Sequence, residues 1–360
     1  MTRSSRGGMP SVVKVAQQAG VSTATAARAL GSYGSVSEKA RQRVLAAAEA
    51  LSYRPNGLAR SMITGLTRTI GMVVPDIENP FFSRAVRGMA DVAHEQGSQV
   101  LVLNTDEDVE SELQALTVLT ERRVDGLVIA PTDAADRSAL EGVIKSGIPV
   151  VLLDRTVRGL AADSVGIDNR AAAREATQRL IDLGHQDIAL LTGAPAELQP
   201  HLMRPGLRGV ERLTGTTVGT RAAGYRDALT AAGINLRTEL VSAEGFHRQD
   251  AAKAIRRLMS LSRPPTAVLA LDSLLALGVL QGLRELRLRC PDDVSLIGFD
   301  DADWAVAISP PLTVVAQSVY EMGKVAGQLL LERVAGSDRA PVRCRLPVRL
   351  IERESAGRRR

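Results

Sequence analysis

Five side chains of types that contact DNA lie close together near the N-terminus, at the start of one short predicted helix. The residues are Ser22, Thr23, Ala24, Thr25 and Arg28. A Thr hydroxyl can hydrogen-bond to a base edge, an Ala methyl can contact the methyl group of thymine, and an Arg side chain can bind guanine through two hydrogen bonds. Ser22 and Thr25, together with the free backbone amides of a helix N-terminus, suit phosphate groups. The spacing therefore favours a helix that reads the DNA major groove.

The surrounding sequence predicts the small helical unit that such a reading helix needs. Residues 12–19 have helical spacing, and Gly20 is placed to end that helix. Ser22 then caps a helix over residues 23–30. A third helix over residues 37–51 presents an apolar face made by Val44, Leu45, Ala48 and Leu51. Two short helices joined by a tight turn form a helix-turn-helix, whose second helix enters the major groove. The alternative is a solvent-facing helix in some other small bundle.

The segment 53–62, Y-R-P-N-G-L-A-R-S-M, allows two interpretations. Leu58, Ala59 and Met62 have helical spacing, but a helix this short is marginal on its own. It could fold on binding DNA, and a paired apolar side chain could then insert into a minor-groove base step and kink the duplex. The other interpretation is a plain linker.

Charge is distributed unevenly along the chain. The net charge is +5, and residues 1–68 contain ten Lys and Arg against Glu38 and Glu49, which gives +8 there and −3 in the remainder. A small basic unit joined to a weakly acidic one is typical of a protein that binds the phosphate backbone.

A second group of polar residues follows predicted strands in the rest of the chain. Apolar runs such as 69–75, 98–104, 125–131 and 149–154, and later 187–192, 239–243, 266–271 and 294–300, alternate with predicted helices. This alternation indicates two doubly wound α/β lobes with parallel sheets, which bind ligands outside the carboxyl ends of their strands. The residues at those ends are Asp76, Asn79, Asp106, Asp154, Arg155, Asp272, Asp300 and Asp301. Several carboxylates with an Arg suit a hydroxyl-rich ligand, although each acid could instead cap a helix or bridge the lobes.

Other functions lack their motifs. No Gly-rich phosphate loop follows a strand, so no dinucleotide cofactor is expected, and no nucleophilic or metal-binding set suggests an enzyme. Cys290 and Cys344 form no pair motif, and the four histidines have no ligand spacing. We find neither a membrane-spanning run nor a secretory signal, which predicts a cytoplasmic protein. The alternatives are a periplasmic-type sugar-binding protein and an enzyme on a doubly wound fold.

The motifs K-V-A-Q-Q-A-G-V-S-T-A-T-A-A-R-A-L, Y-R-P-N-G-L-A-R-S-M and G-M-V-V-P-D-I-E-N-P-F-F, in this order, resemble the lactose-repressor/galactose-repressor (LacI/GalR) family. The resemblance extends from Val12 to Ser355. It implies base reading by Thr23, Ala24 and Arg28, and a hinge helix in which Met62 takes the place of the usual Leu wedge. The hinge residues expected to contact DNA with it are Asn56, Ala59 and Arg60.

The same resemblance implies a set of effector-binding residues, namely Phe82, Arg221, Phe246, Asp272 and Asp300. Arg221 is expected just before an amphipathic helix. Two departures from the family pattern stand out. Leu271 replaces a usual Asn, and the stretch 194–220 is longer than usual, with Arg212 in a similar motif as a rival to Arg221.

The expected organisation has five parts. A tail over residues 1–9 precedes a helix-turn-helix headpiece over 10–54 and a hinge helix or linker over 55–67. A two-lobed core over 68–355, with crossovers near 166, 315 and 347, precedes a disordered tail over 356–360. The resemblance implies a homodimeric repressor that binds a pseudo-palindromic operator, under the control of a small, sugar-like effector. No leucine heptads suggest a tetramerising coiled coil.

Overall fold

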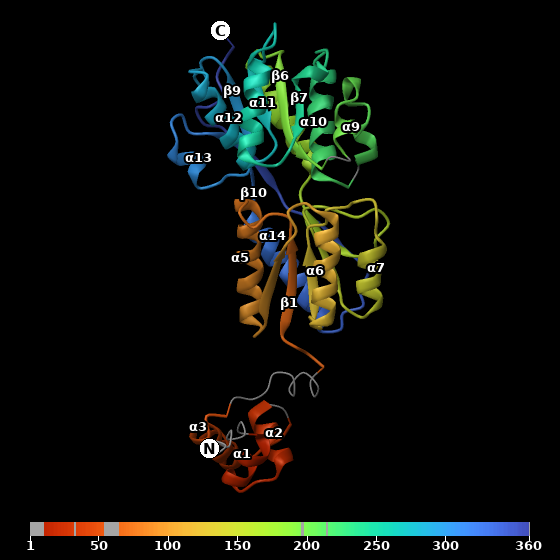
Figure 1. Ribbon diagram of the computed structural model, residues 1–360, viewed down its shortest axis with the longest axis vertical. Coiled ribbons are helices and arrows are strands. Elements are labelled where there is room, and N and C mark those ends of the chain that lie inside the picture. Colours follow the sequence, from red (N-terminus) through yellow and green to blue (C-terminus); the bar gives the residue numbers. More distant parts are fainter. Residues whose placement is uncertain (1–10, 32–33, 54–64, 196–197, 214, 360) are drawn as a thin grey trace, which may run out of the picture. The chain divides into compact units, whose positions relative to one another are not determined.

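The computed structural model describes residues 11–31, 34–53, 65–195, 198–213 and 215–359. The chain divides into two compact units, residues 1–67 and residues 68–360. Figure 1 shows the helices of the first unit and the two sheets of the second.

The first unit contains three helices around a small apolar core. They are α1 (Val12–Ala19), α2 (Thr23–Gly31) and α3 (Glu38–Ala50). The side chains of Ser11 and Ser37 cap α1 and α3, and Gly20 ends α1 in the left-handed conformation at φ 64°. The buried residues are Val15, Ala16, Ala19, Ala26, Ala29, Val44, Ala47 and Ala48. The prediction that Leu45 belongs to the apolar face of α3 is wrong. Leu45 directly follows the buried Val44, and its side chain is 50% exposed.

The second unit consists of two lobes, each built on a six-stranded sheet. The first sheet has the order β11-β5-β4-β3-β1-β2 and the second β12-β10-β9-β8-β6-β7. All pairings are parallel except β10 with β12. The first-lobe strands are β1 (Thr69–Val74), β2 (Gln99–Asn104), β3 (Gly126–Ile129), β4 (Val150–Leu153), β5 (Asp163–Gly166) and β11 (Arg343–Arg345). The second-lobe strands are β6 (Ile188–Ala194), β7 (Val241–Glu244), β8 (Ala267–Ala270), β9 (Ser295–Phe299), β10 (Thr313–Gln317) and β12 (Val348–Ile351).

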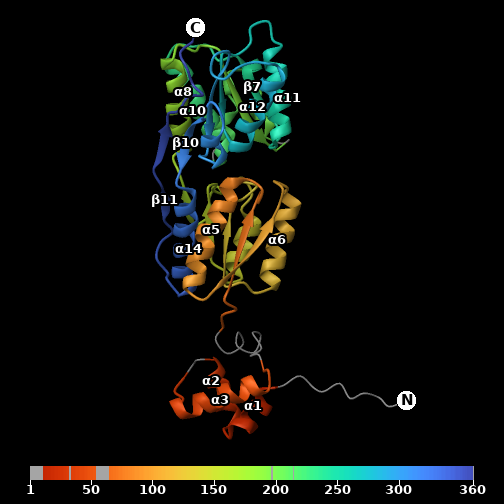
Figure 2. The same cartoon turned by 90° about the vertical axis from the view of Figure 1, so that its left-hand side faces the viewer.

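Helices cover both sheets, which confirms the predicted α/β class. The first lobe has α5 (Pro80–Glu95), α6 (Val109–Glu121), α7 (Ser138–Lys145) and α14 (Val319–Val334). The second lobe has α8 (Asn169–Asp182), α9 (Gln199–Leu202), α10 (Thr217–Ala231), α11 (Arg248–Met259), α12 (Ser273–Glu285) and α13 (Trp304–Ala307), with the 3-10 helices η1 (Pro205–Leu207), η2 (Val210–Leu213) and η3 (Thr238–Leu240). In Figure 2, α5 and α14 lie side by side against the first sheet. Within the described residues, no helix is both long and apolar enough to cross a membrane.

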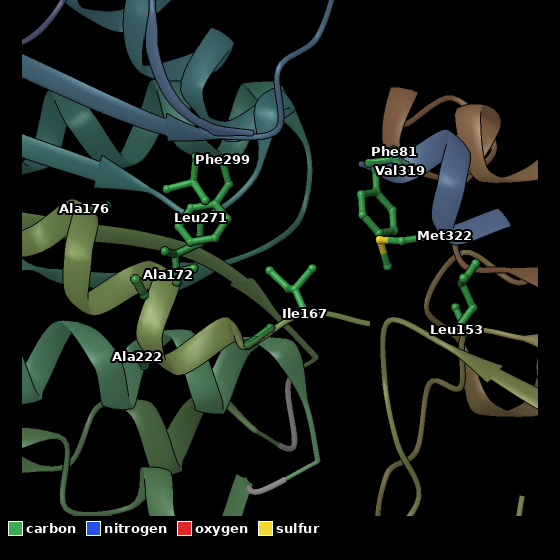
Figure 3. Close-up of a cluster of buried hydrophobic side chains, with 14 of the residues drawn as sticks. Phe81, Leu153, Ile167, Ala172, Ala176, Ala222, Leu271, Phe299, Val319 and Met322 are labelled. Carbon is green, nitrogen blue, oxygen red and sulfur yellow. The ribbon is translucent and has the colours of Figure 1, made fainter. Parts of the chain in front are cut away.

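The chain passes between the lobes three times. β5 of the first sheet leads to α8 of the second lobe, β10 of the second sheet leads to α14 of the first, and β11 leads to β12. Figure 3 shows Leu271 and Phe299 together in the second lobe and Phe81, Val319 and Met322 together in the first. The carboxyl ends of the strands of both lobes border the space between them, which is where a ligand site is expected.

The C-terminal segment corrects one expected boundary. Residues 356–359 are not a disordered tail, because backbone and side-chain groups of the second lobe hold them. The Gly357 amide donates to Ser295 Oγ at 3.0 Å, and the Arg359 amide donates to the Leu183 carbonyl at 2.9 Å. His185 Nε2 lies 3.0 Å from the Gly357 carbonyl. The core therefore extends at least to Arg359.

Candidate functional site: a cleft between two lobes and a helix-turn-helix

A cavity of about 470 Å³ lies between the two lobes of the second unit. All five predicted effector residues line it: Phe82, Arg221, Phe246, Asp272 and Asp300. The same cavity contains Asp76, Asn79, Asp106, Asp154 and Arg155 from the predicted strand-end group. Asp301 does not belong to this lining set, because its carboxylate pairs with Arg353 at 2.8 Å. The fold thus brings together residues from two lobes that lie up to 224 residues apart in sequence, Asp76 and Asp300.

Arg221 is fixed on the second-lobe side of the cleft. It lies inside α10, not before a helix as expected, since α10 already begins at Thr217 behind the Thr216 cap. Its Nε donates to Asn169 Oδ1 at 2.7 Å and its Nη1 to the Leu271 carbonyl at 2.6 Å. The guanidinium carbon lies 4.3 Å from the centre of the Phe299 ring, close enough for a cation–π contact. These contacts leave little rotational freedom to a side chain that is 7% exposed.

The rival arginine lies elsewhere. Arg212 is an exposed residue of η2 and lines a different cavity, together with Leu213 and Thr216. The long stretch that contains it contributes only its last residues, such as Thr217 and Val218, to the cleft lining. Between the two candidates, Arg221 is the arginine of the cleft.

Asp272 makes both of the contacts that sequence reasoning offered as alternatives to ligand binding. Its Oδ1 caps α12 by accepting from the amides of Leu274 at 2.7 Å and Leu275 at 3.3 Å. Its Oδ2 accepts from Asn79 Nδ2 of the first lobe at 2.7 Å. Asp272 is therefore a helix cap, a lobe-to-lobe contact and a cleft residue at once. Burial raises the pKa of the Asp272 carboxyl above its ordinary value.

Asp154 and Asp300 complete a group of three acids around Arg221. Both adopt the left-handed conformation, at φ 63° and 67°, directly after a buried strand. Asp300 Oδ1 accepts from Gln317 Nε2 at 2.6 Å, whereas Asp154 Oδ1 has no hydrogen-bond partner among the described residues. Burial raises the pKa of both carboxyls, to about 7 for Asp300, although Arg221 opposes that rise. Such a group can accept hydrogen bonds from the hydroxyl or amine groups of a ligand.

Several cleft features had no clear sequence signal. Glu107 forms a two-pronged ion pair with Arg155, with one Nη1–Oε2 distance of 2.7 Å and both side chains 12% exposed. Glu107 follows the predicted strand 98–104 by only three residues, which could have suggested it. Asn169, which orients Arg221, is the first residue of α8 in the same lobe, and no local pattern indicates that role.

The helix-turn-helix residues lie at an exposed helix start. Ser22, Thr23 and Ala24 are exposed, and Ser22 Oγ caps α2 by accepting from the Thr25 amide at 3.1 Å. Arg28 is half-buried and its Nε donates back to the Ala24 carbonyl at 3.3 Å. The predicted hinge contacts Asn56, Ala59, Arg60 and Met62 lie outside the described residues.

A helix-turn-helix unit joined to a two-lobed ligand-binding core defines a ligand-responsive DNA-binding protein. Comparison with known proteins agrees: residues 12–56 match the bacterial regulatory proteins of the lacI family, and residues 177–356 match a periplasmic binding protein-like domain. The HTH-type transcriptional regulator RegA of Clostridium saccharobutylicum is 32% identical over 96% of this chain and 98% of its own. The chain therefore belongs to the LacI family and is a transcriptional regulator with an effector-binding core.

Solved structures show the same architecture. A LacI family transcriptional regulator from Enterococcus faecium with bound ribose is 31% identical, with a TM-score of 0.69 over 81% of this chain and 100% of that one. The complex of the transcriptional regulator CelR with cellobiose is 30% identical, with a TM-score of 0.68 over 96% and 99% of the two chains.

Proposed function

We propose that the effector binds in the cleft among Asp154, Arg221, Asp272 and Asp300, and that its binding controls operator affinity. One observation carries this proposal: three acids and one arginine converge in a cavity whose walls come from both lobes. Asp154 lines the cavity, and its carboxyl would accept a hydrogen bond from a ligand hydroxyl. Related proteins have been crystallised with ribose and cellobiose. A small, hydroxyl-rich molecule of the sugar type fits this chemistry best.

The contact between Asn79 and Asp272 suggests how the ligand would act. This hydrogen bond joins the lobes directly through the cleft, so a ligand that binds Asp272 competes with it or adds to it. A ligand can change DNA affinity only if it binds one lobe arrangement better than the other. Contacts to both walls of the cleft provide that difference.

The DNA-binding part of the proposal assigns roles within α2. Thr23, Ala24 and Arg28 would contact base edges in the major groove, and Ser22 and Thr25 would hold phosphates. Asn56, Ala59, Arg60 and Met62 would add hinge contacts in the minor groove. The exposed positions of Ser22, Thr23 and Ala24 support this assignment.

We further propose that two copies of the chain pair through the core and bind a pseudo-palindromic operator. Two apolar surfaces support pairing. On the first lobe, α6 exposes Val109 and Leu113 beside β2, the edge strand of the sheet. On the second lobe, a surface groove is lined by the half-buried Leu277, Leu280, Leu288 and Ile308, together with several arginines. Apolar side chains at the surface favour an interaction site, and a two-fold dimer would use the same surface of both copies.

Selection of binding sites from a random DNA pool with the full-length chain tests these proposals together. The expected selected sequence is an inverted repeat. Ribose or cellobiose, added to the complex with that DNA, should shift the affinity of the protein for the DNA if either sugar resembles the effector. Recovery of a single, asymmetric half-site would contradict the dimer. A full sugar panel that leaves Trp fluorescence and DNA affinity unchanged, while other polar metabolites alter them, would contradict the sugar assignment alone.

A further inference from the structure

The lining of the effector cleft contains many more acids than positively charged side chains. Among the described residues that line it, the charged bases are Arg155 and Arg221, whereas seven side chains carry a carboxyl group. Glu107 is one of the seven, and its ion pair with Arg155 balances it. The other six are Asp76, Glu78, Asp106, Asp154, Asp272 and Asp300. Arg221 is the arginine that remains to balance these six acids.

The three more buried acids of the cleft share Arg221. Burial raises the pKa of the carboxyl groups of Asp154, Asp272 and Asp300, and the charge of Arg221 opposes the rise in all three. Repulsion by Asp272 and Asp154 raises the pKa of Asp300 further. One arginine thus serves three carboxyl groups that repel one another. A second cation in the cleft would stabilise their ionised form.

The remaining acids of the lining form hydrogen bonds with uncharged groups. Asp76 Oδ1 accepts from the Glu78 amide at 2.9 Å, and Asp106 Oδ1 accepts from Asn104 Nδ2 at 2.6 Å. Neither contact balances a negative charge. Glu78 and Asp106 are exposed and Asp76 is half-buried, so their charges act on a ligand that approaches from solvent.

Three of the acids occupy positions that asparagine would also suit. Asp106, Asp154 and Asp300 adopt the left-handed conformation, at φ 53°, 63° and 67°. After Gly, Asn and Asp are the residues that adopt this conformation most readily. Asn has nearly the same shape as Asp and no charge. The backbone therefore does not explain the negative charge at these positions, whereas recognition of a cation does.

Much of the hydrogen-bond donor capacity of the lining is already used. Arg155 and Arg221 donate to protein acceptors, and the side-chain amides of Asn79 and Asn104 donate to two of the cleft acids. An ionised carboxylate accepts hydrogen bonds and donates none. A matching ligand consequently supplies more donors than acceptors. An ammonium group supplies three donors and no acceptor, whereas a hydroxyl group supplies one donor and two acceptor positions.

The arrangement of the acids does not suit a metal ion. Within the described part of the chain, no group of three or more acids, histidines or cysteines lies close enough together to hold one. The carboxyl groups are instead distributed over both walls of a cavity of about 470 Å³. A cavity of this size holds an organic molecule.

We propose that the effector of the cleft is a hydroxyl-rich organic cation, namely an amino sugar or a related polyhydroxylated amine. This inference rests on the proposed function of the cleft and specifies the charge of its ligand. The ammonium group balances the excess of carboxylates, and the hydroxyl groups donate to the other acids. The same excess disfavours a sugar phosphate or a sugar acid, because the cleft would repel its negative charge.

Matched sugars test the proposal with the full-length protein. The pairs are glucose with glucosamine, galactose with galactosamine and mannose with mannosamine, and 1-deoxynojirimycin adds an amine within the ring. Their affinities are measured by calorimetry at about pH 6.5, below the usual pKa of an amine, and their effects on operator binding are measured beside them. At least one amine should bind about 10- to 150-fold more tightly than its neutral parent, the value of one hydrogen bond to a charged group.

Substitutions of single acids test the origin of this preference, expressed as the ratio of the amine affinity to the parent affinity. Asp154→Asn keeps the shape of the side chain and should remove most of the ratio. Asp106→Asn, at an exposed position, should lower it about 1.5- to 5-fold, and it keeps the test valid if Asp154→Asn does not fold. Asp108→Asn is the matched control and should leave the ratio unchanged, because Asp108 caps α6 from outside the cleft lining.

The possible failures are distinguishable. Neutral sugars that bind as tightly as the amines, with binding lost in Asp272→Asn, would reject a cationic effector and retain the proposed function of the cleft. A wild-type ratio in both Asp154→Asn and Asp106→Asn would reject it as well. If no amine binds, the inference is wrong, and the neutral sugars then test the proposed function alone. Ligands that bind and act equally well in Asp272→Asn would contradict the proposed function itself, together with the inference drawn from it.

Discussion

The start of α2 and the interlobe cleft hold their functional side chains in opposite ways. At α2, three of the residues are exposed and the cap bond of Ser22 reaches only to Thr25. In the cleft, Arg221 is buried and its two hydrogen bonds join it to Asn169 and Leu271, about fifty residues away in either direction. An exposed side chain of α2 can be replaced without affecting the others, whereas the buried side chains of the cleft depend on one another. Substitutions should therefore reveal this difference directly.

The largest effect is expected for Arg221→Ala. It leaves three neighbouring carboxyls without their shared cation and removes the partner of Asn169. Asn169 Oδ1 and the Leu271 carbonyl would each lose a charged donor, and a buried acceptor without its partner typically costs about 1–3 kcal/mol of folding free energy. Effector binding should be lost as well. Thermal melting and effector titration measure both losses.

Arg212→Ala is the matched control, because Arg212 is exposed and lies outside the cleft. It should change the melting temperature little and leave effector affinity unchanged. If the two alanine variants behaved alike, the assignment of Arg221 as the arginine of the cleft would be wrong.

Next in size is the effect of replacing Asp272, which caps α12 and lines the proposed effector cleft. Asp272→Asn keeps a side chain that caps helices well, whereas Asp272→Ala also loses about 1 kcal/mol of stability. Both variants should bind operator DNA normally and lose an effector response that typically amounts to about 5- to 150-fold. Operator titrations with and without effector, run beside melting curves, separate the two roles. A stable Asp272→Asn variant that responds at wild-type effector concentrations would show that the carboxylate only caps the helix.

In α2, by contrast, Arg28→Ala should weaken the recognition of one base position and change no other property of the protein. The expected cost is about 1–3 kcal/mol on the preferred sequence, with relaxed specificity at that position. Binding to random DNA and the melting temperature should stay close to wild type, because the hydrogen bond that Arg28 makes within the described part of the chain is a local one, to the Ala24 carbonyl. An equal loss on specific and random DNA would instead identify Arg28 as a phosphate contact.

The same difference decides what could be predicted from sequence. The predicted caps Ser22 and Ser37 and the turn glycine Gly20 act within a few residues, and the three helices begin close to the predicted positions. The Ser11 cap, which was not predicted, is local as well. Strand ends were predictable for a similar reason, since a buried run followed by Asp154, Asp272 or Asp300 marks the edge of a parallel sheet.

Contacts between distant elements were not predictable in this way. Sequence spacing does not reveal that Asn79 reaches Asp272. It also does not reveal that residue 271 binds Arg221 through its backbone carbonyl, a contact that does not depend on the side chain at position 271. The ordered end at residues 356–359 depends on His185 and Ser295, which lie more than sixty residues earlier. The basic composition A-G-R-R-R indicated a tail because composition carries no information about such partners.

The smallest effect concerns pH and should affect the core alone. The pKa of Asp300 is about 7 in the folded protein, against an ordinary value of 3.8. Between these values the folded state holds a proton that the unfolded state releases, so this contribution to stability is complete below about pH 4 and is lost as pH rises through 7. From pH 6 to pH 8 the loss amounts to about 1.4 kcal/mol, and Asp300→Asn should abolish it.

The single tryptophan, Trp304, lies in the second unit, so its fluorescence reports unfolding of the core without the headpiece. His185 opposes the trend, because burial lowers its pKa and stability gained through it rises with pH. His185 is present in both the wild type and the Asp300→Asn variant. Subtracting the stability of Asp300→Asn from that of the wild type at each pH therefore isolates the contribution of Asp300. If the two profiles are parallel between pH 6 and 8, Asp300 is ionised throughout this range, and its negative charge is present when the effector binds.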